Sequence, residues 1–273
     1  IWQYHFNPVF AKAPNTRDLM AVLDRQIGPD DIIVRNFPGP DFDYYYNGPA
    51  PTVVLPHRGV DPGPELDELT QDRSYVWFLP QPDKVWDSEQ VVAAWLQENL
   101  QLVSDQWIGA IRLQQYAAYE ATPDQIAYSL NITFDDLVIL AGYRVTPPLS
   151  KPLEREAVLA LELFWLPLST SETDLTVFVH LLGPPREDGS PLWAQDDHPP
   201  QDGRANTTLW TVAQLLRDVY CLTIPTDAPA ATYYITVGLY DPDTGERLPI
   251  SGTDVTQPEP EGALVLTFTL GEP

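Results

Sequence analysis

The spacing of apolar residues changes character near the middle of the chain. In residues 15–116, helical and strand-like patterns alternate. Asn15 suits an N-cap, and the apolar residues that follow it recur at helical spacing up to the stop at Gly28 and Pro29. Two further segments, 64–72 and 87–99, predict helices, the second opened by a capping-box-like pair, Asp87 and Gln90.

Short runs rich in β-branched and aromatic residues separate these helices. They cover residues 31–34, 52–55 and 75–79, each bounded by proline or glycine, which is typical of buried strands in a helix-covered sheet. Residues 102–107 and 111–116 then predict a closing hairpin. The order predicts a small Rossmann-like, mixed-sheet α/β domain over residues 1–117.

Residues 118–128 lack periodicity and predict a linker. Beyond it the chain contains short apolar or alternating runs, separated by turn sequences such as Asp188-Gly189 and 241–246. Eight strands and no helix predict an antiparallel β-sandwich over residues 129–273. The eight runs are 131–134, 137–145, 157–166, 175–182, 192–195, 219–224, 233–240 and 263–270.

Composition and charge limit the classes of partner expected for this chain. The 39 acidic and 15 basic residues give a formal net charge of -24, which repels phosphate backbones and anionic lipid headgroups. We therefore expect no nucleic-acid partner and no membrane insertion by this chain, since no apolar stretch reaches the roughly 20 residues of a bilayer span. Neutral or cationic partners fit the charge. Cys221 lies in an apolar run and is expected to be a small core residue.

The chain opens on an aromatic segment with Trp2, Tyr4 and Phe6. Aromatic residues favour the membrane–water boundary, so a transmembrane segment ending upstream is one interpretation. A buried N-terminal strand explains the same residues equally well, and both alternatives stay open.

Nucleotide and catalytic signatures are missing. The loop after the first strand, residues 36–41, has one glycine and two prolines, so it offers no run of N–H groups to a pyrophosphate. No Gly-x-Ser-x-Gly elbow is present, and Cys221 has no histidine beside it in sequence. We therefore expect no catalytic residue and no cofactor. His180, within an apolar strand, predicts a hydrogen-bonded structural histidine.

The densest set of possible ligands to a metal is Asp196, Asp197, His198 and Asp202. Their spacing matches no established metal-binding template, and a solvated loop with turn-capping aspartates is the favoured interpretation. No metal is expected.

Aromatic and acidic residues that cluster in sequence are the candidate ligand contacts, because aromatic rings stack on sugar faces and carboxylates accept hydroxyl protons. One cluster follows the first strand, where α/β sheets usually bind ligands; the other falls in the predicted sandwich. The candidates are Asp41, Asp43, Tyr44, Tyr45 and Tyr46 in the first, and Trp193, Asp196, His198 and Trp210 in the second.

Longer segments resemble a known family. The sequences DLTVFVHLL at 174–182, LWAQDDHPPQDG at 192–203, LW at 209–210 and ITVGLYDPDTGERL at 235–248 resemble the C-terminal sandwich of bacterial membrane glycosyltransferases, notably from Chloroflexi. NP at 7–8, GPDD at 28–31, WIG at 107–109 and Arg112 are similar to the soluble α/β region of these dolichyl-phosphate-mannose mannosyltransferase-like enzymes, of the glycosyltransferase family 39 type.

The resemblance implies a location and a role. The chain would be the non-catalytic C-terminal region on the extracytoplasmic face of a bacterial cell membrane, with the membrane domain of the same polypeptide as its partner. It would orient a glycan or polyprenyl-linked sugar acceptor, or support the membrane domain. The family's catalytic acids lie between membrane helices that this chain lacks, so no catalytic position carries over. A free-standing carbohydrate-binding protein and a structural or protein-interaction module are the alternatives.

Overall fold

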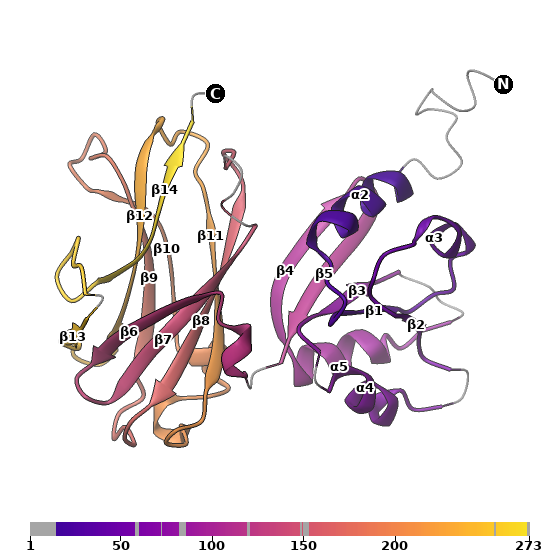
Figure 1. The fold of residues 1–273 in the computed structure, drawn as a ribbon, viewed down its shortest axis with the longest axis horizontal. Helices are drawn as coiled ribbons and strands as arrows, with labels where there is room; N and C mark the ends of the chain where they lie inside the picture. Colours follow the sequence, from indigo (N-terminus) through magenta and orange to yellow (C-terminus); the bar gives the residue numbers. More distant parts are fainter. Residues whose placement is uncertain are drawn as a thin grey trace. The chain divides into compact units, whose positions relative to one another are not determined.

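The computed structural model describes residues 15–57, 60–71, 73–81, 86–118, 121–147, 149, 153–253 and 255–271. The chain divides into two compact units, Ile1–Ala118 and Tyr119–Pro273, here called the α/β unit and the two-sheet unit (Figure 1). Within the described ranges, no helix is both long and apolar enough to cross a membrane. The alternatives for the aromatic N-terminal segment concern residues outside the described ranges.

A five-stranded mixed sheet forms the centre of the α/β unit, in the order β2-β1-β3-β5-β4. β1 is parallel to both β2 and β3, whereas β5 is antiparallel to β3 and β4. The expected mixed sheet with a closing hairpin is confirmed in these terms. The strands are β1 (Ile32–Arg35), β2 (Thr52–Val54), β3 (Val76–Leu79), β4 (Gln101–Ile108) and β5 (Ile111–Ala117).

Helices cover both faces of this sheet (Figure 1). Alternation in β1 turns Ile32 and Val34 toward α4 and α5, where they share an apolar core with Leu66 and Leu96. The opposite face, which includes Arg35, carries α2 and α3. The helices are α2 (Thr16–Gln26), α3 (Pro40–Tyr45), α4 (Gly63–Thr70) and α5 (Val91–Asn99).

Two helix starts differ from the sequence prediction. The segment after β1 was expected to be irregular, but Pro40 stands in the first turn of α3 with Asp41 and Asp43, a favourable N-terminal composition. Helix α5 begins at Val91 rather than at Asp87, because Gln90 adopts a left-handed conformation with φ 53°. The carboxylate of Asp87 instead accepts a hydrogen bond from the Val91 amide at 3.0 Å.

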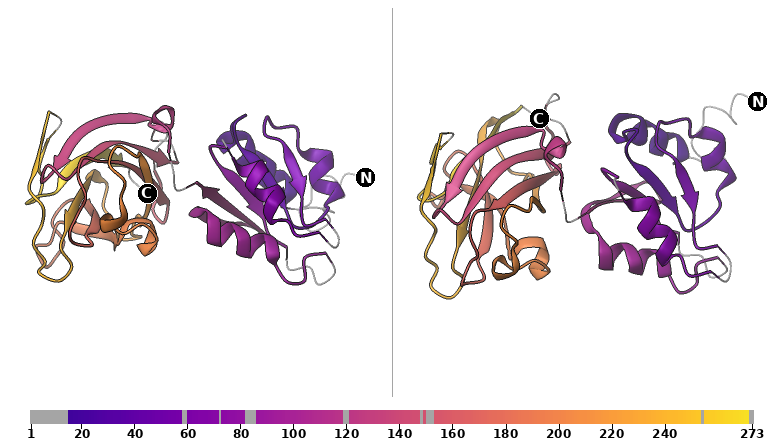
Figure 2. Two further views of the ribbon diagram at one scale, coloured as in Figure 1. Left: turned by 90° about the horizontal axis from the view of Figure 1, so that it is seen from below. Right: turned by 60° about the horizontal axis from the view of Figure 1, so that its bottom comes forward.

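Two antiparallel sheets make up the second unit, with strand orders β10-β9-β12-β14 and β11-β8-β7-β6-β13. Figure 2 shows the two sheets lying face to face. Their facing sides share one apolar core, which includes Trp165, Val179, Tyr220 and Ile235. The described helical turns here are short 3-10 segments: η2 (Pro123–Gln125), η3 (Pro200–Gly203) and η4 (Thr207–Leu209). The strands are β6 (Tyr128–Phe134), β7 (Val138–Thr146), β8 (Val158–Pro167), β9 (Thr176–Leu182), β10 (Leu192–His198), β11 (Leu216–Thr223), β12 (Ala231–Tyr240), β13 (Ile250–Gly252) and β14 (Ala263–Leu270).

Three details of this unit correct the sequence prediction. Strand β10 runs to His198, so residues 196–198 pair with β9 and do not form a solvated loop. Cys221 is exposed, because the alternation of β11 turns Tyr220 and Leu222 into the core instead. The short edge strand β13 has too few apolar residues to be recognised.

The predicted turn after β12 is confirmed. The carboxylate of Asp241 accepts a hydrogen bond from the Asp243 amide at 2.8 Å, and Gly245 adopts φ +73°. This is the geometry of a tight turn closed by an aspartate side chain.

Candidate functional site

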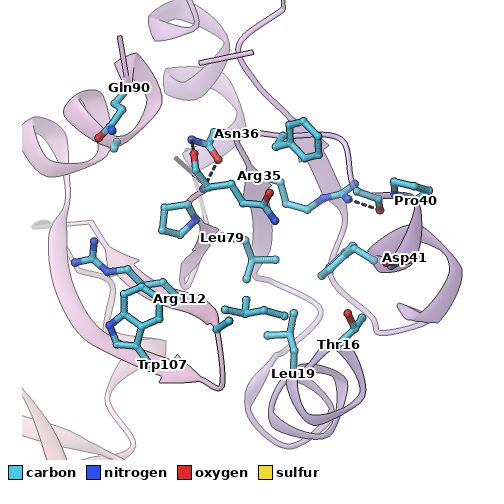
Figure 3. A pocket seen from close by; sticks show the side chains of 18 residues that line it. Thr16, Leu19, Arg35, Asn36, Pro40, Asp41, Leu79, Gln90, Trp107 and Arg112 are labelled. Carbon is cyan, nitrogen blue, oxygen red and sulfur yellow. Dashed lines mark hydrogen bonds between the residues drawn. The ribbon is translucent and has the colours of Figure 1, made fainter. Parts of the chain in front are cut away.

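A pocket of about 710 Å³ opens at the carboxyl ends of β1 and β3 in the α/β unit. Its lining comes from the ends of these strands, the turn between β4 and β5, and the starts of α2 and α3, with part of α5. Figure 3 shows Trp107 and Arg112 across the pocket from Pro40 and Asp41, with Leu79 between the two sides. The volume falls in the range of small-molecule sites, and this edge is where open α/β sheets bind ligands.

Asn36 ties the two strand ends together. Its Oδ1 accepts a hydrogen bond from the Gln81 amide at 2.7 Å, and its Nδ2 donates to the Gln81 carbonyl at 3.0 Å. The same Nδ2 donates to Asp87 at 3.3 Å. Because a buried side chain links the loops after β1 and β3, the floor of the pocket is fixed before any ligand binds.

Arg35 forms part of the pocket wall and is held on several sides. Its Nη2 lies 2.6 Å from Oδ1 of Asp43, and its guanidinium carbon lies 4.4 Å from the centre of the Phe42 ring. Nη1 donates a long hydrogen bond of 3.5 Å to the Gly39 carbonyl. Nε is buried and makes no hydrogen bond with the part of the chain that the structure describes. The positive charge of Arg35 is thus already neutralised within the unit.

The opposite wall presents an indole ring beside a second ion pair. Trp107 is 68% exposed although it is a large apolar side chain. Arg112 Nε donates to Asp105 at 2.9 Å, and Arg112 Nη2 contacts the other carboxylate oxygen of Asp105. Gln114 donates to the same carboxylate at 3.2 Å. These hydrogen bonds, that from Arg112 above all, lower the pKa of Asp105.

Four polar side chains in the lining make no hydrogen bond or ion pair with any part of the chain that the structure describes. They are Thr16, Asp41, Gln81 and Gln90. The pocket therefore offers one hydroxyl, two amides and one carboxylate whose donors and acceptors are available to a ligand.

The candidate residues after β1 divide into those near the pocket and those that pack locally. Asp41 lines the pocket, and Asp43 pairs with Arg35. Tyr44 is 78% exposed and Tyr45 lies beneath Arg17, but neither lines the pocket. Tyr46 stacks on Phe42 with ring centres 5.1 Å apart and donates its hydroxyl to the Ala50 carbonyl. Within this cluster, Asp41 is the residue placed for ligand contact.

The candidates of the two-sheet unit have mainly structural contacts. Trp210 is 4% exposed, packs on Trp165 and donates Nε1 to the Ala205 carbonyl, so neither face of its ring is open to a ligand. Trp193 donates to the Pro184 carbonyl at 2.9 Å and lies beneath Arg186.

Asp196 and His198 also make contacts between the two sheets, and neither lines the pocket of the α/β unit. Asp196 accepts a hydrogen bond from the Cys221 amide at 2.6 Å, across from β10 to β11. The His198 ring stacks on Tyr220 with centres 4.1 Å apart. Among the described residues, no group of three or more histidine, cysteine, aspartate or glutamate side chains converges on a metal site.

His180 forms a buried ionic cluster on β9. Its Nδ1 lies 3.0 Å from Glu259, and its Nε2 lies 3.7 Å from Asp197. Burial alone would lower the pKa of His180, but the two carboxylates more than offset it and raise that pKa to about 9. Burial would raise the pKa of Glu259, yet His180, Thr236 and Arg247 lower it to about 2. The expected hydrogen bonding of His180 is confirmed.

Most of the pocket lining was missed from the sequence. Arg35, Gln81, Gln90, Trp107 and Arg112 come from segments separated by up to 77 positions, and none was among the predicted ligand contacts. One signal was available for two of them. Arg35 directly follows the predicted strand 31–34, and Gln81 lies two residues after the predicted strand 75–79. The carboxyl ends of parallel strands meet at one edge of a sheet.

The comparisons with known proteins add no relative. A scan of the chain against protein-family models matches none of them, and a search of curated proteins returns no significant match.

Proposed function

We propose that this chain is a non-catalytic glycan-binding region, and that the sugar binds in the carboxyl-edge pocket of the α/β unit. By resemblance, we further propose that it is the extracytoplasmic C-terminal region of a bacterial membrane glycosyltransferase. The α/β unit would then be a Rossmann-like domain that presents an acceptor glycan, and the two-sheet unit an accessory β-sandwich.

The observation that carries the proposal is the exposed Trp107 ring in one pocket with polar side chains that have no partner among the described residues. A pyranose has an apolar face that stacks on an aromatic ring, and hydroxyls that both donate and accept hydrogen bonds. Amides such as those of Gln81 and Gln90 satisfy a hydroxyl in either role. A preformed pocket also spares the ligand the cost of ordering the site, which Asn36 has already fixed.

The test is calorimetric or array binding of a varied glycan set to the whole chain and to Trp107→Ala. We expect the loss of one stacking platform to weaken binding about 5- to 150-fold, since aromatic contacts and their buried area contribute about 1–3 kcal/mol. Tyr44→Ala is the matched control, because it removes a more exposed aromatic ring from the same unit outside the pocket. Equal losses in the two variants, or a loss only in Trp193→Ala, would contradict the assignment.

Two alternatives are separated by simple observations. Apolar membrane helices encoded upstream of residue 1 would support the membrane glycosyltransferase, whereas a signal peptide there would favour a free-standing carbohydrate-binding protein. A flat response across the whole glycan set, with the chain folded, would favour a structural or interaction module.

A further inference from the structure

Resting on the proposed function, we infer that the pocket selects uncharged sugars and rejects phosphorylated ones, with Trp107 as the stacking platform and Asp41 as the acceptor for sugar hydroxyls. The inference concerns the class of ligand, and it stands on how the charges in and around the pocket are paired.

Both arginines of the pocket are already engaged. Arg35 lies 2.6 Å from Asp43, and Arg112 makes a two-pronged pair with Asp105. A ligand phosphate would have to displace one of these carboxylates and take over its hydrogen bonds. Three carboxylates, including that of Asp41, face two guanidinium groups, so the site has no surplus of positive charge.

Backbone N–H groups do not provide another source of attraction for a ligand phosphate. Anion sites in α/β sheets use a glycine-rich loop whose successive N–H groups point at the phosphate. Here the segment after β1 contains Pro38 in the loop and Pro40 in the first turn of α3, and neither proline has an N–H. Helix α3 itself has only six residues. The formal charge of -24 on the whole chain adds a repulsive background to any anion.

Asp41 favours ligands with hydroxyl groups over negatively charged ligands. Its carboxylate lines the pocket and makes no hydrogen bond or ion pair with the described residues. An ionised carboxylate only accepts hydrogen bonds, so it favours hydroxyl donors and repels a phosphate. A cation without hydroxyl groups would satisfy Asp41 but would leave the N–H donors of Gln81 and Gln90 without an acceptor in the ligand, whereas the hydroxyls of a neutral sugar can pair with all three side chains.

The experiment titrates the whole chain, by calorimetry, with methyl hexosides and disaccharides, with the same hexoses as phosphates, and with glucosamine. We expect the neutral sugars to bind at least tenfold more tightly than their phosphates, with little dependence on salt. Asp41→Asn is expected to weaken neutral-sugar binding about 10- to 100-fold, the range for hydrogen bonds to a charged group. Asp24→Asn, which makes the same charge change at an exposed position of α2 outside the pocket, should have no effect.

The outcomes separate this inference from the proposed function. Tighter binding of the phosphates, lost in Arg112→Met, would overturn the selectivity and leave a glycan site in place. Tighter binding of glucosamine, lost in Asp41→Asn, would also overturn it in favour of a cationic ligand. If no sugar of any class binds the folded chain, the proposed function fails first and this inference fails with it.

Discussion

The two units use charged side chains in opposite ways. In the two-sheet unit, Arg217 Nε lies 3.3 Å from Glu162 with both side chains 1% exposed, and His180 is enclosed with Glu259. In the α/β unit, the ion pair of Arg112 and Asp105 lies at a pocket wall open to solvent. Charge in the first case is enclosed by protein, and in the second it borders a space that a ligand can enter.

This difference separates structural polar groups from candidate binding groups. A buried charge is tolerated only with partners, and the buried charges of the two-sheet unit are paired with each other. At the pocket of the α/β unit, the side chains of Asp41, Gln81 and Gln90 make no hydrogen bond or ion pair with the described residues. We therefore place ligand binding in the α/β unit, although the acidic run of the two-sheet unit contains more possible ligands in sequence.

The largest expected effect comes from Arg217→Met. The substitution leaves Glu162 buried without its ion-pair partner, and the two-sheet unit should lose about 3–5 kcal/mol of unfolding free energy. Hydrogen exchange of peptides from β8 and β11, measured against urea, assigns the loss to this unit.

Two further variants control this prediction. Arg112→Met breaks a partly exposed pair and should cost at most about 1 kcal/mol. The double variant Glu162→Leu with Arg217→Met should recover much of the stability, because it removes both charges. Equal losses for the Arg217 and Arg112 variants would refute the contrast between the units.

A smaller loss, about 2–3 kcal/mol, is expected for His180→Gln at pH 6, since it removes the cation between Asp197 and Glu259. His57→Gln is the matched control, because His57 is exposed and pairs with Glu65 at 3.3 Å in solvent. The measurement is the unfolding free energy in urea. An equal change in the two variants would show that enclosure of His180 contributes nothing.

The pH dependence of the His180 effect follows from the two shifted pKa values. The pKa of His180 rises from 6.5 to about 9, so its stabilisation is complete below pH 6.5 and is lost as pH rises through about 9. The pKa of Glu259 falls from 4.5 to about 2, so its stabilisation is complete above pH 4.5 and is lost as pH falls through about 2. The difference in unfolding free energy between wild type and His180→Gln should therefore be largest between pH 4.5 and pH 6.5. A difference that grows above pH 9 would contradict the ion pair.

The smallest effect on stability is expected for Asp43→Asn, about 0.5–1 kcal/mol, because Asp43 is more than half exposed. The variant tests charge selectivity more directly through ligand binding. Because Arg35 loses its neutralising carboxylate, the affinity for hexose phosphates should rise relative to that for neutral sugars. Calorimetric titration of both ligands measures the change. An unchanged ratio of affinities would indicate that the pairing of Arg35 does not set the charge selectivity.

The sequence predicted elements whose signal is local. The apolar runs of β8, β9 and β12 and the Asp241 turn are encoded within a few residues, and they lie where expected. Two short elements were not predicted: α3 spans six residues and β13 three, and neither contains an apolar run like those of the predicted strands β1, β2 and β3.

The pocket was harder to predict because it is assembled from distant segments. Trp107 lies near the end of strand β4, and the strand pattern alone does not determine whether its ring is buried or exposed. Trp210 shows the converse. Its aromatic character suggested a ligand contact, but the packing with Trp165 makes it a core residue.

The most direct test follows the indole N–H signals of the eight tryptophans by NMR while a glycan that binds the chain is titrated into the protein. Substitution of single tryptophans by phenylalanine assigns the signals. We predict that the indole N–H signal of Trp107 shifts with ligand concentration, whereas the signals of Trp193 and Trp210 in the two-sheet unit do not change. A saturable shift of Trp193 with no change at Trp107 would contradict the assignment of glycan binding to the α/β unit.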